Sequence, residues 1–134
     1  MKVILDTNVL VSGLMFPDSV PGAAVAAWRE GRFELVMPLA QLEEIGRVLA
    51  YPKIRRILQW DDEAIGRFLK QLYLRAEVVE PPARGVQVRD PDDLHVLRAL
   101  AAGAAELLVT GDDDLLVLRN QYAVETPAQF ARRL

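Results

Sequence analysis

The chain has 134 residues, enough for one domain with a substantial core, and its hydrophobic residues, 51% of the total, are spread along the whole length. It contains no cysteine, which excludes disulfides, thiolate metal sites and cysteine nucleophiles. Its formal net charge of −3 argues against a large basic surface for nucleic acid, although acids gathered at one site would leave the remaining surface close to neutral.

We expect neither a leader nor a membrane segment. It starts directly with a strand-like run, without the basic and apolar regions of a signal sequence. No apolar run approaches the roughly 18 residues that a membrane span requires. We therefore expect a cytoplasmic, soluble protein that does not engage a membrane, folded as a single domain over residues 1–134.

Strands and helices alternate along the first half of the chain. Residues 3–5 form a continuous apolar run before a polar turn, which predicts a buried strand. A helix is expected from Pro21-Gly22 to about Glu30, followed by a second strand at 33–37. Three helices then follow without a strand between them, from Pro38 to the break at Tyr51-Pro52, at 53–59 and at 61–75.

The second half continues the alternation. Short strands are expected at 78–79, 107–109 and 122–124. Helices are expected from Asp90-Pro91 to Ala102, at 115–118, and after Thr126-Pro127, where Thr fits the N-cap and Pro the first helical position. This order predicts a three-layer α/β/α sandwich with a central parallel sheet. The consecutive helices between Pro38 and Arg75 predict an inserted helical lobe over one end of the sheet.

Three clusters of acidic residues stand next to these elements. Asp6 follows the first strand, the run Asp90-Pro91-Asp92-Asp93 opens a helix, and Asp112–Asp114 follow the strand at 107–109. Functional groups at the carboxyl ends of parallel strands collect at one edge of a sheet. Carboxylates that meet there repel one another, so they indicate a divalent cation, a shared proton or a raised pKa, and we favour the cation.

Taken singly, each acid is better explained as a helix cap. Asp90 before Pro91 fits an N-cap, and the acids at 112–114 fit the start of the next helix. Caps account for one acid per helix, however, and not for three in close succession. They also do not explain why Asp6 directly follows a buried strand, where desolvation makes a free carboxylate costly. Considered together, the clusters favour a metal site.

Three segments of the chain resemble the PIN domain family: MKVILDTNVLVSGL at 1–14, RDPDDLHVLRALAAG at 89–103 and LVTGDDDLLVL at 108–118. The spacing is similar to the branch of VapC-like ribonucleases, the toxins of toxin–antitoxin systems. The resemblance covers nearly the whole chain and implies a PIN-like, Rossmann-like sandwich. It further implies a metal-dependent endoribonuclease that hydrolyses RNA phosphodiester bonds and leaves a 5′-phosphate, with an antitoxin protein and a second copy of the chain, in a homodimer, as partners.

The resemblance also assigns roles to individual residues. The catalytic residues it implies are Asp6, Glu44, Asp93 and Asp112. The residues it implies as metal ligands are Asp6, Asp93, Asp112 and Asp114. The polar residues it implies as supports for these carboxylates are Thr7, Asn8 and Thr110.

Some assignments stay open when the residues are considered without the family. Glu43 and Glu44 lie on opposite flanks of the apolar stripe of their helix, and Asp92 and Asp93 share one helix turn, so only the resemblance selects the second of each pair. His95 lies two residues after Asp93 and points to a different helix face, so we expect a partly buried surface residue.

Two other features also have two readings. Ser12 either faces substrate or packs in the turn after the first motif. The basic run of Lys53, Arg55 and Arg56 is a candidate contact with the RNA backbone, and its alternative is a solvated helix face. Trp28 and Trp60 are expected to be packing residues.

The donor chemistry selects the cation and limits the rival functions. An all-carboxylate set without Cys or a suitable His favours Mg²⁺ or Mn²⁺ over zinc. A phosphatase of the haloacid dehalogenase type would need a second Asp two residues after Asp6 as general acid, and this chain has Asn8 there. A PIN-like scaffold that binds RNA or protein without cutting is the other alternative, and the retained acids argue against it.

Overall fold

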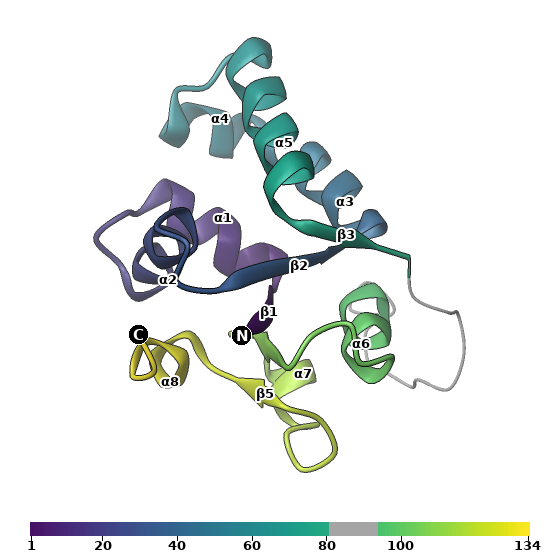
Figure 1. Ribbon diagram of the computed structural model, residues 1–134. Coiled ribbons are helices and arrows are strands. Elements are labelled where there is room, and N and C mark those ends of the chain that lie inside the picture. The colour runs from purple at the N-terminus through teal and green to yellow at the C-terminus, as the bar shows by residue number, and fades with distance from the viewer. Residues whose placement is uncertain (81–93) are drawn as a thin grey trace.

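A five-stranded parallel sheet forms the centre of the molecule (Figure 1). The computed structural model describes residues 1–80 and 94–134. Its strands lie in the spatial order β3-β2-β1-β4-β5, and each pair of neighbours is parallel. The strand bounds are β1 Lys2–Leu5, β2 Glu34–Pro38, β3 Glu77–Val79, β4 Leu107–Val109 and β5 Val124–Glu125. Because all strands run the same way, their carboxyl ends lie along one edge.

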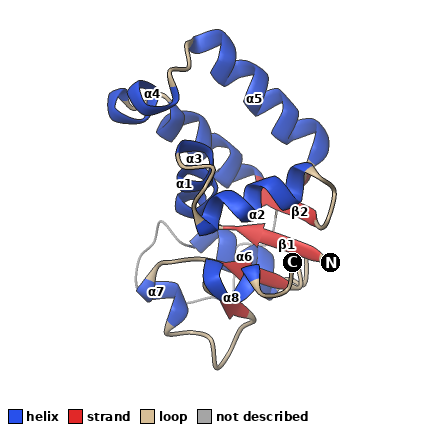
Figure 2. Ribbon diagram, turned by 90° about the vertical axis from the view of Figure 1, so that its left-hand side faces the viewer, coloured by secondary structure: helices blue, strands red, loops and turns tan. Residues whose placement is uncertain are grey.

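Helices cover both faces of this sheet (Figures 1 and 2). Their bounds are α1 Thr7–Met15, α2 Val20–Arg29, α3 Leu39–Leu49, α4 Pro52–Leu58, α5 Asp62–Arg75, α6 Leu94–Ala101, α7 Asp113–Leu116 and α8 Pro127–Ala131. One hydrophobic core includes residues of α1, α2, α3, α5 and α8, and a second core includes residues of α6 and α7. The three-layer α/β/α prediction is therefore confirmed.

The central strand β1 has a continuous apolar run because both of its faces are buried. Val3 and Leu5 belong to the core shared with α1 and α2, whereas Ile4 belongs to the core shared with α6. Successive side chains of a strand point to opposite faces, so a strand buried on both faces has no polar alternation. All three side chains are fully buried.

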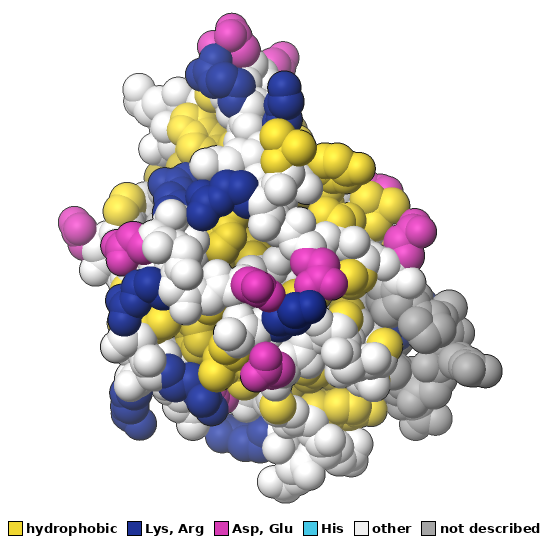
Figure 3. Space-filling model, in the orientation of Figure 1, with side chains coloured by type: hydrophobic (Ala, Val, Ile, Leu, Met, Phe, Trp, Pro, Cys, Tyr) yellow, Lys and Arg dark blue, Asp and Glu magenta, His cyan; other side chains and the backbone are white. Residues whose placement is uncertain are grey.

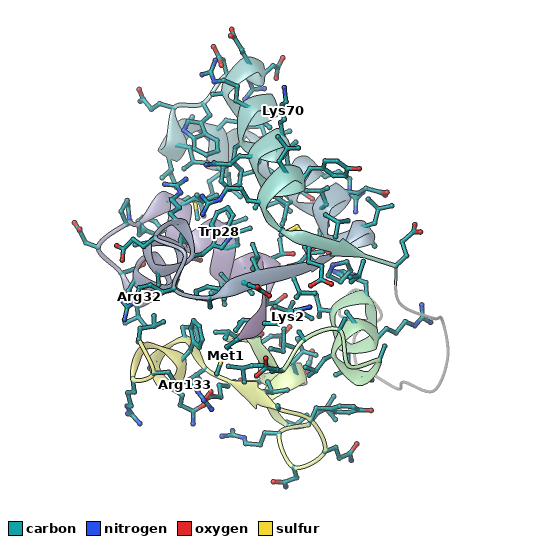
Figure 4. The ribbon with its side chains drawn as sticks, viewed as in Figure 1. Met1, Lys2, Trp28, Arg32, Lys70 and Arg133 are labelled. Carbon is teal, nitrogen blue, oxygen red and sulfur yellow. The ribbon has the colours of Figure 1, made fainter. Side chains whose placement is uncertain are left out.

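The helices α3, α4 and α5 form the predicted lobe, which extends beyond the sheet (Figure 1). Arg75, the last residue of α5, joins it to the main body. Its guanidinium lies 4.7 Å from the ring centroid of Trp28 and donates to the carbonyls of Trp28 and Arg29, both at 3.2 Å. Trp28 lies between α2 and α5 (Figure 4), and Trp60 packs on the same core, so both are the packing residues expected.

The turn expected after the first strand was a wrong prediction, because helix α1 begins there. Val9, Leu10 and Val11 are all buried, because other elements cover α1 on several sides. A helix of this kind lacks the one-sided apolar stripe by which a surface helix is recognised. The short helix α7 and the last strand are also displaced by one or two residues from the expected ranges. The start expected for α6 at Asp90-Pro91 lies outside the described residues.

Among the described residues, no single helix is long and apolar enough to cross a membrane. Only α1 and α2 taken together meet that test of length and composition, as a pair bent by 93°. Both helices supply buried residues to the core.

Candidate active site

Asp6 lies at the carboxyl end of the central strand and is only 8% exposed. Its Oδ1 accepts a hydrogen bond from the Thr7 amide at 2.9 Å, and its Oδ2 accepts one from the Thr110 hydroxyl at 2.7 Å. Burial raises the pKa of this carboxyl above its ordinary value of 3.8, and the charges of Glu44 and Asp112 raise it further, while the two hydrogen bonds act in the opposite direction.

Thr110 connects the ends of β1 and β4. Its fully buried hydroxyl donates to Asp6 and accepts from the Asp112 amide at 3.0 Å. Asp112 is the N-cap of α7, where its Oδ1 accepts from the Asp114 amide at 2.9 Å. Asp112 therefore has the capping role considered from the sequence and also lies close enough to Asp6 to affect its pKa. Capping engages one of its two carboxylate oxygens, so the two roles are compatible.

Glu44 approaches the same edge of the sheet from α3. Its charge acts on the Asp6 carboxyl, and its Oε2 lies 3.6 Å from Nε2 of His95 on α6. The side chains of Glu44 and His95 are 26% and 19% exposed, so the pair is largely shielded. Glu43 is exposed and lines a pocket between α3 and α6 that His95 also lines, whereas the charge of Glu44 acts on Asp6. This placement favours Glu44 over Glu43 as a partner of Asp6.

The carboxylate set fits a hard cation, although no complete cage is formed. Within residues 1–80 and 94–134, no three Asp, Glu or His side chains converge as a metal site. Asp92 and Asp93 lie outside the described residues, so the family's third acid stays a prediction. The charges of Glu44 and Asp112 act on the buried Asp6 carboxylate, and carboxylate oxygens are the ligands that hard divalent cations take in proteins.

The supporting residues have unequal roles. Thr7 and Thr110 hydrogen-bond to Asp6 directly. Among the described residues, Asn8 makes no hydrogen bond to these carboxylates and is exposed at the start of α1, so its supporting role stays a prediction. Asp114 contributes its amide to the cap, and its role as a metal ligand is likewise a prediction.

The basic run lies on α4, in the lobe. Arg55 is partly engaged, because it pairs with Asp62 at 3.1 Å and donates to the Trp60 carbonyl at 3.3 Å. Lys53 and Arg56 are exposed. On the face drawn in Figure 3, Lys and Arg are scattered among Asp and Glu and do not form one extended patch. A contact of this run with RNA stays a prediction, with Arg55 also serving to join α4 to α5.

Gln41 is a site residue that the sequence reasoning missed. It is fully buried one turn before Glu44, and its Nε2 donates to the Leu5 carbonyl at 2.6 Å and lies 3.5 Å from the Thr7 hydroxyl. Its Oε1 is buried without a hydrogen-bond partner among the described residues. The side chain thus ties α3 to the end of β1 and fixes Glu44 relative to Asp6.

The sequence held one signal for Gln41. It precedes Ile45 and Leu49 by four and eight residues, so it is a polar residue on the buried stripe of α3. Buried polar side chains require hydrogen-bond partners, so a polar residue at such a position is expected to bond to a neighbouring element. The close approach of His95 to Glu44 has no such signal, because it depends on how α3 packs against α6.

We expect Gln41→Ala to destabilise the protein by about 2–3 kcal/mol, because a buried hydrogen bond is lost and a cavity remains. Urea denaturation measures the change in the free energy of unfolding. Gln71→Ala, at an exposed position of α5, is the matched control and should change stability by less than about 0.5 kcal/mol. Equal stabilities of the two variants would contradict the anchoring role.

The fold and the site define a parallel α/β protein whose acidic residues gather at the carboxyl ends of its strands. Residues 2–114 match the family model of the PIN domain, and the chain belongs to this family. It is also 29% identical, over 140 residues, to an uncharacterized protein of Methanocaldococcus jannaschii, an alignment that covers 97% of this chain and 89% of that protein. No solved structure matches the chain. PIN domains are commonly nucleases, so membership supports a hydrolase that acts on nucleic acid.

Proposed function

We propose that the chain is an Mg²⁺- or Mn²⁺-dependent endoribonuclease. The observation that carries the proposal is the buried Asp6 carboxylate, whose pKa is raised by its burial and by the charges of Glu44 and Asp112. Membership of the PIN domain family supports the nuclease class. The choice of RNA as substrate follows the resemblance to VapC-like ribonucleases.

In this proposal the ion is held by Asp6, Asp112 and Asp93, with Asp114 as a further ligand. A divalent cation bound there supplies an activated water and neutralises charge on the leaving oxygen of a phosphodiester. Glu44 lies beside Asp6 and either completes the ligand set or orients the attacking water.

The remaining residues position these carboxylates. Thr110 and the Thr7 amide hold one oxygen each of Asp6, which limits rotation of that carboxylate. Gln41 holds α3 at the distance that keeps Glu44 beside Asp6. No protein nucleophile is required, because water attacks the phosphorus and the 3′-oxygen leaves, so the products carry a 5′-phosphate and a 3′-hydroxyl.

The test is cleavage of a mixed RNA pool by purified protein in Mn²⁺ or Mg²⁺ and in EDTA, with single-stranded DNA in parallel. We expect cleavage of RNA that requires the metal and leaves 5′-phosphates, which polynucleotide kinase cannot label before phosphatase treatment. RNA binding that is equal with and without metal, with no turnover, would instead support the non-catalytic scaffold. A trapped aspartyl-phosphate on Asp6 would support the phosphatase.

The finer biological role is also a proposal. We propose that this ribonuclease is the toxin of a toxin–antitoxin pair, acts in the cytoplasm, and works as a homodimer of single-domain chains spanning residues 1–134. The toxin, the antitoxin and the dimer rest on the family resemblance. The single domain is supported by the end of the chain, where β5 pairs with β4 and Phe130 of α8 packs on Phe33 with ring centroids 5.2 Å apart. Growth arrest on expression, relieved by a protein encoded beside this one, tests the toxin role.

A further inference from the structure

A pocket of about 270 Å³ adjoins Asp112. It lies where α1, the start of α2, the loop before α7 and the start of α8 meet, and we name it the Ser12 pocket. Its polar lining is Asn8, Ser12 and Asp112, and its apolar lining includes Val9, Pro21 and Pro127. The pocket therefore opens beside one of the acids proposed to hold the cation.

The polar side chains of α1 in this pocket are not used elsewhere. Asn8 and Ser12 are four residues apart, so they lie on one face of the helix. The side chains of both make no hydrogen bond within the described residues, although the Ser12 carbonyl accepts from the Phe16 amide as part of the helix end. Thr110 and the Thr7 amide each donate to one oxygen of Asp6, and within the described residues neither Asn8 nor Ser12 is engaged with Asp6, so their side chains are available to a ligand.

The charge of the pocket favours a neutral part of a nucleotide over its phosphate. Neither Lys nor Arg belongs to its described lining, and Asp112 contributes a negative charge, so a phosphate is disfavoured there. A neutral group that both donates and accepts hydrogen bonds matches the amide of Asn8 and the hydroxyl of Ser12. The 2′-hydroxyl of ribose has both capacities and is the group by which proteins distinguish RNA from DNA.

We propose that the Ser12 pocket binds the ribose of the nucleotide next to the scissile phosphate, with Asn8 and Ser12 hydrogen-bonded to its 2′-hydroxyl. The apolar walls from Val9, Pro21 and Pro127 contact the carbon side of the sugar. This inference rests on the proposed nuclease function and adds the residues by which the enzyme selects RNA over DNA.

Neutral nucleosides test the pocket without metal and without repulsion from the acids. Adenosine, cytidine and uridine, and their 2′-deoxy counterparts, are titrated into the protein in EDTA, and amide chemical shifts are followed by NMR. We expect shifts at Val9, Ser12 and Gly111, and tighter binding of ribonucleosides than of deoxynucleosides, by about three- to tenfold for each of the two hydrogen bonds to the 2′-hydroxyl.

Two variants and one control complete the test. Ser12→Ala should reduce the preference for ribonucleosides by about three- to tenfold, the effect of one hydrogen bond, and Gln71→Ala, on α5, should retain the full preference. Gly111→Leu should weaken binding of both kinds, because a side chain at Gly111 meets no atom within 4 Å and so extends into open space at the pocket. Shifts outside the pocket, or equal affinities for the two sugars in the wild type, overturn the proposal.

The outcome separates this inference from the proposed function. Metal-dependent RNA cleavage without nucleoside-induced shifts in the pocket overturns the ribose site alone. A preference for ribonucleosides in the pocket, reduced by Ser12→Ala, together with no cleavage of RNA in any metal, supports the ribose site and overturns the nuclease.

Discussion

Asp6→Asn is expected to reduce metal-dependent RNA cleavage by about 1,000-fold or more. The substitution removes the negative charge at the buried centre of the carboxylate cluster, and stabilisation of a phosphodiester transition state by a bound cation is worth several kcal/mol. The side chain keeps its size, and its remaining oxygen still accepts from the Thr7 amide. Initial rates of oligonucleotide cleavage in Mn²⁺ measure the effect.

Asp18→Asn is the matched control for this variant. Asp18 is exposed in the loop between α1 and α2, so removing its charge should leave the cleavage rate within about twofold of wild type. Equal cleavage by the Asp6→Asn protein would mean that a contaminating nuclease produces the signal. A large loss in both variants would indicate a general effect of charge on RNA association.

The same Asp6→Asn substitution is expected to make the metal-free protein more stable at pH 7. Burial and the nearby acids raise the pKa of Asp6 in the folded state, so the charged carboxylate opposes folding. This loss of stability is absent below 3.8, the pKa of the Asp6 carboxyl in the unfolded chain, and is complete above its raised pKa in the folded protein. Between the two, wild-type stability falls as pH rises, by about 1.4 kcal/mol for each pKa unit of the shift.

Urea denaturation in EDTA between pH 4 and pH 8 measures this difference. We expect the two proteins to be similar at the acidic end and the variant to be the more stable one at neutral pH. Addition of Mn²⁺ at 100 times its dissociation constant should stabilise the wild type by about 2.7 kcal/mol and the variant far less. A variant that is less stable than wild type at every pH would refute the claim that the charge of Asp6 destabilises the metal-free protein.

The sequence predicts most of the fold, because its strands and amphipathic helices leave simple patterns. The buried run at 3–5 and the stripe of Leu42, Ile45 and Leu49 each give the right element. Helix α1 is missed because it is covered on several sides, so that only the narrow face of Asn8 and Ser12 is polar and the periodicity is weak.

The candidate site is less completely predictable. The parallel topology predicts that acidic residues at the ends of the strands lie at one edge of the sheet. The structure places Glu44 and Asp112 near Asp6. The buried stripe of α3 marks Gln41 as unusual, but its hydrogen-bond partner depends on how α3 packs against β1. The pairing of His95 with Glu44 depends on how α3 packs against α6, and no local pattern encodes that packing. The part of Asp93 in the site stays a prediction, because the residue lies outside the described ranges.

The hydrogen bond between Thr110 and Asp6 joins residues that are 104 positions apart in the chain. Synthesis releases the amino-terminal residues first, so a growing chain carries Asp6 long before Thr110, Asp112 and strand β4 have been made. The acidic cluster is therefore incomplete on any ribosome-bound chain that stops short of β4. The endoribonuclease proposed above would therefore stay inactive beside the messenger RNA that encodes it until most of its own translation is finished.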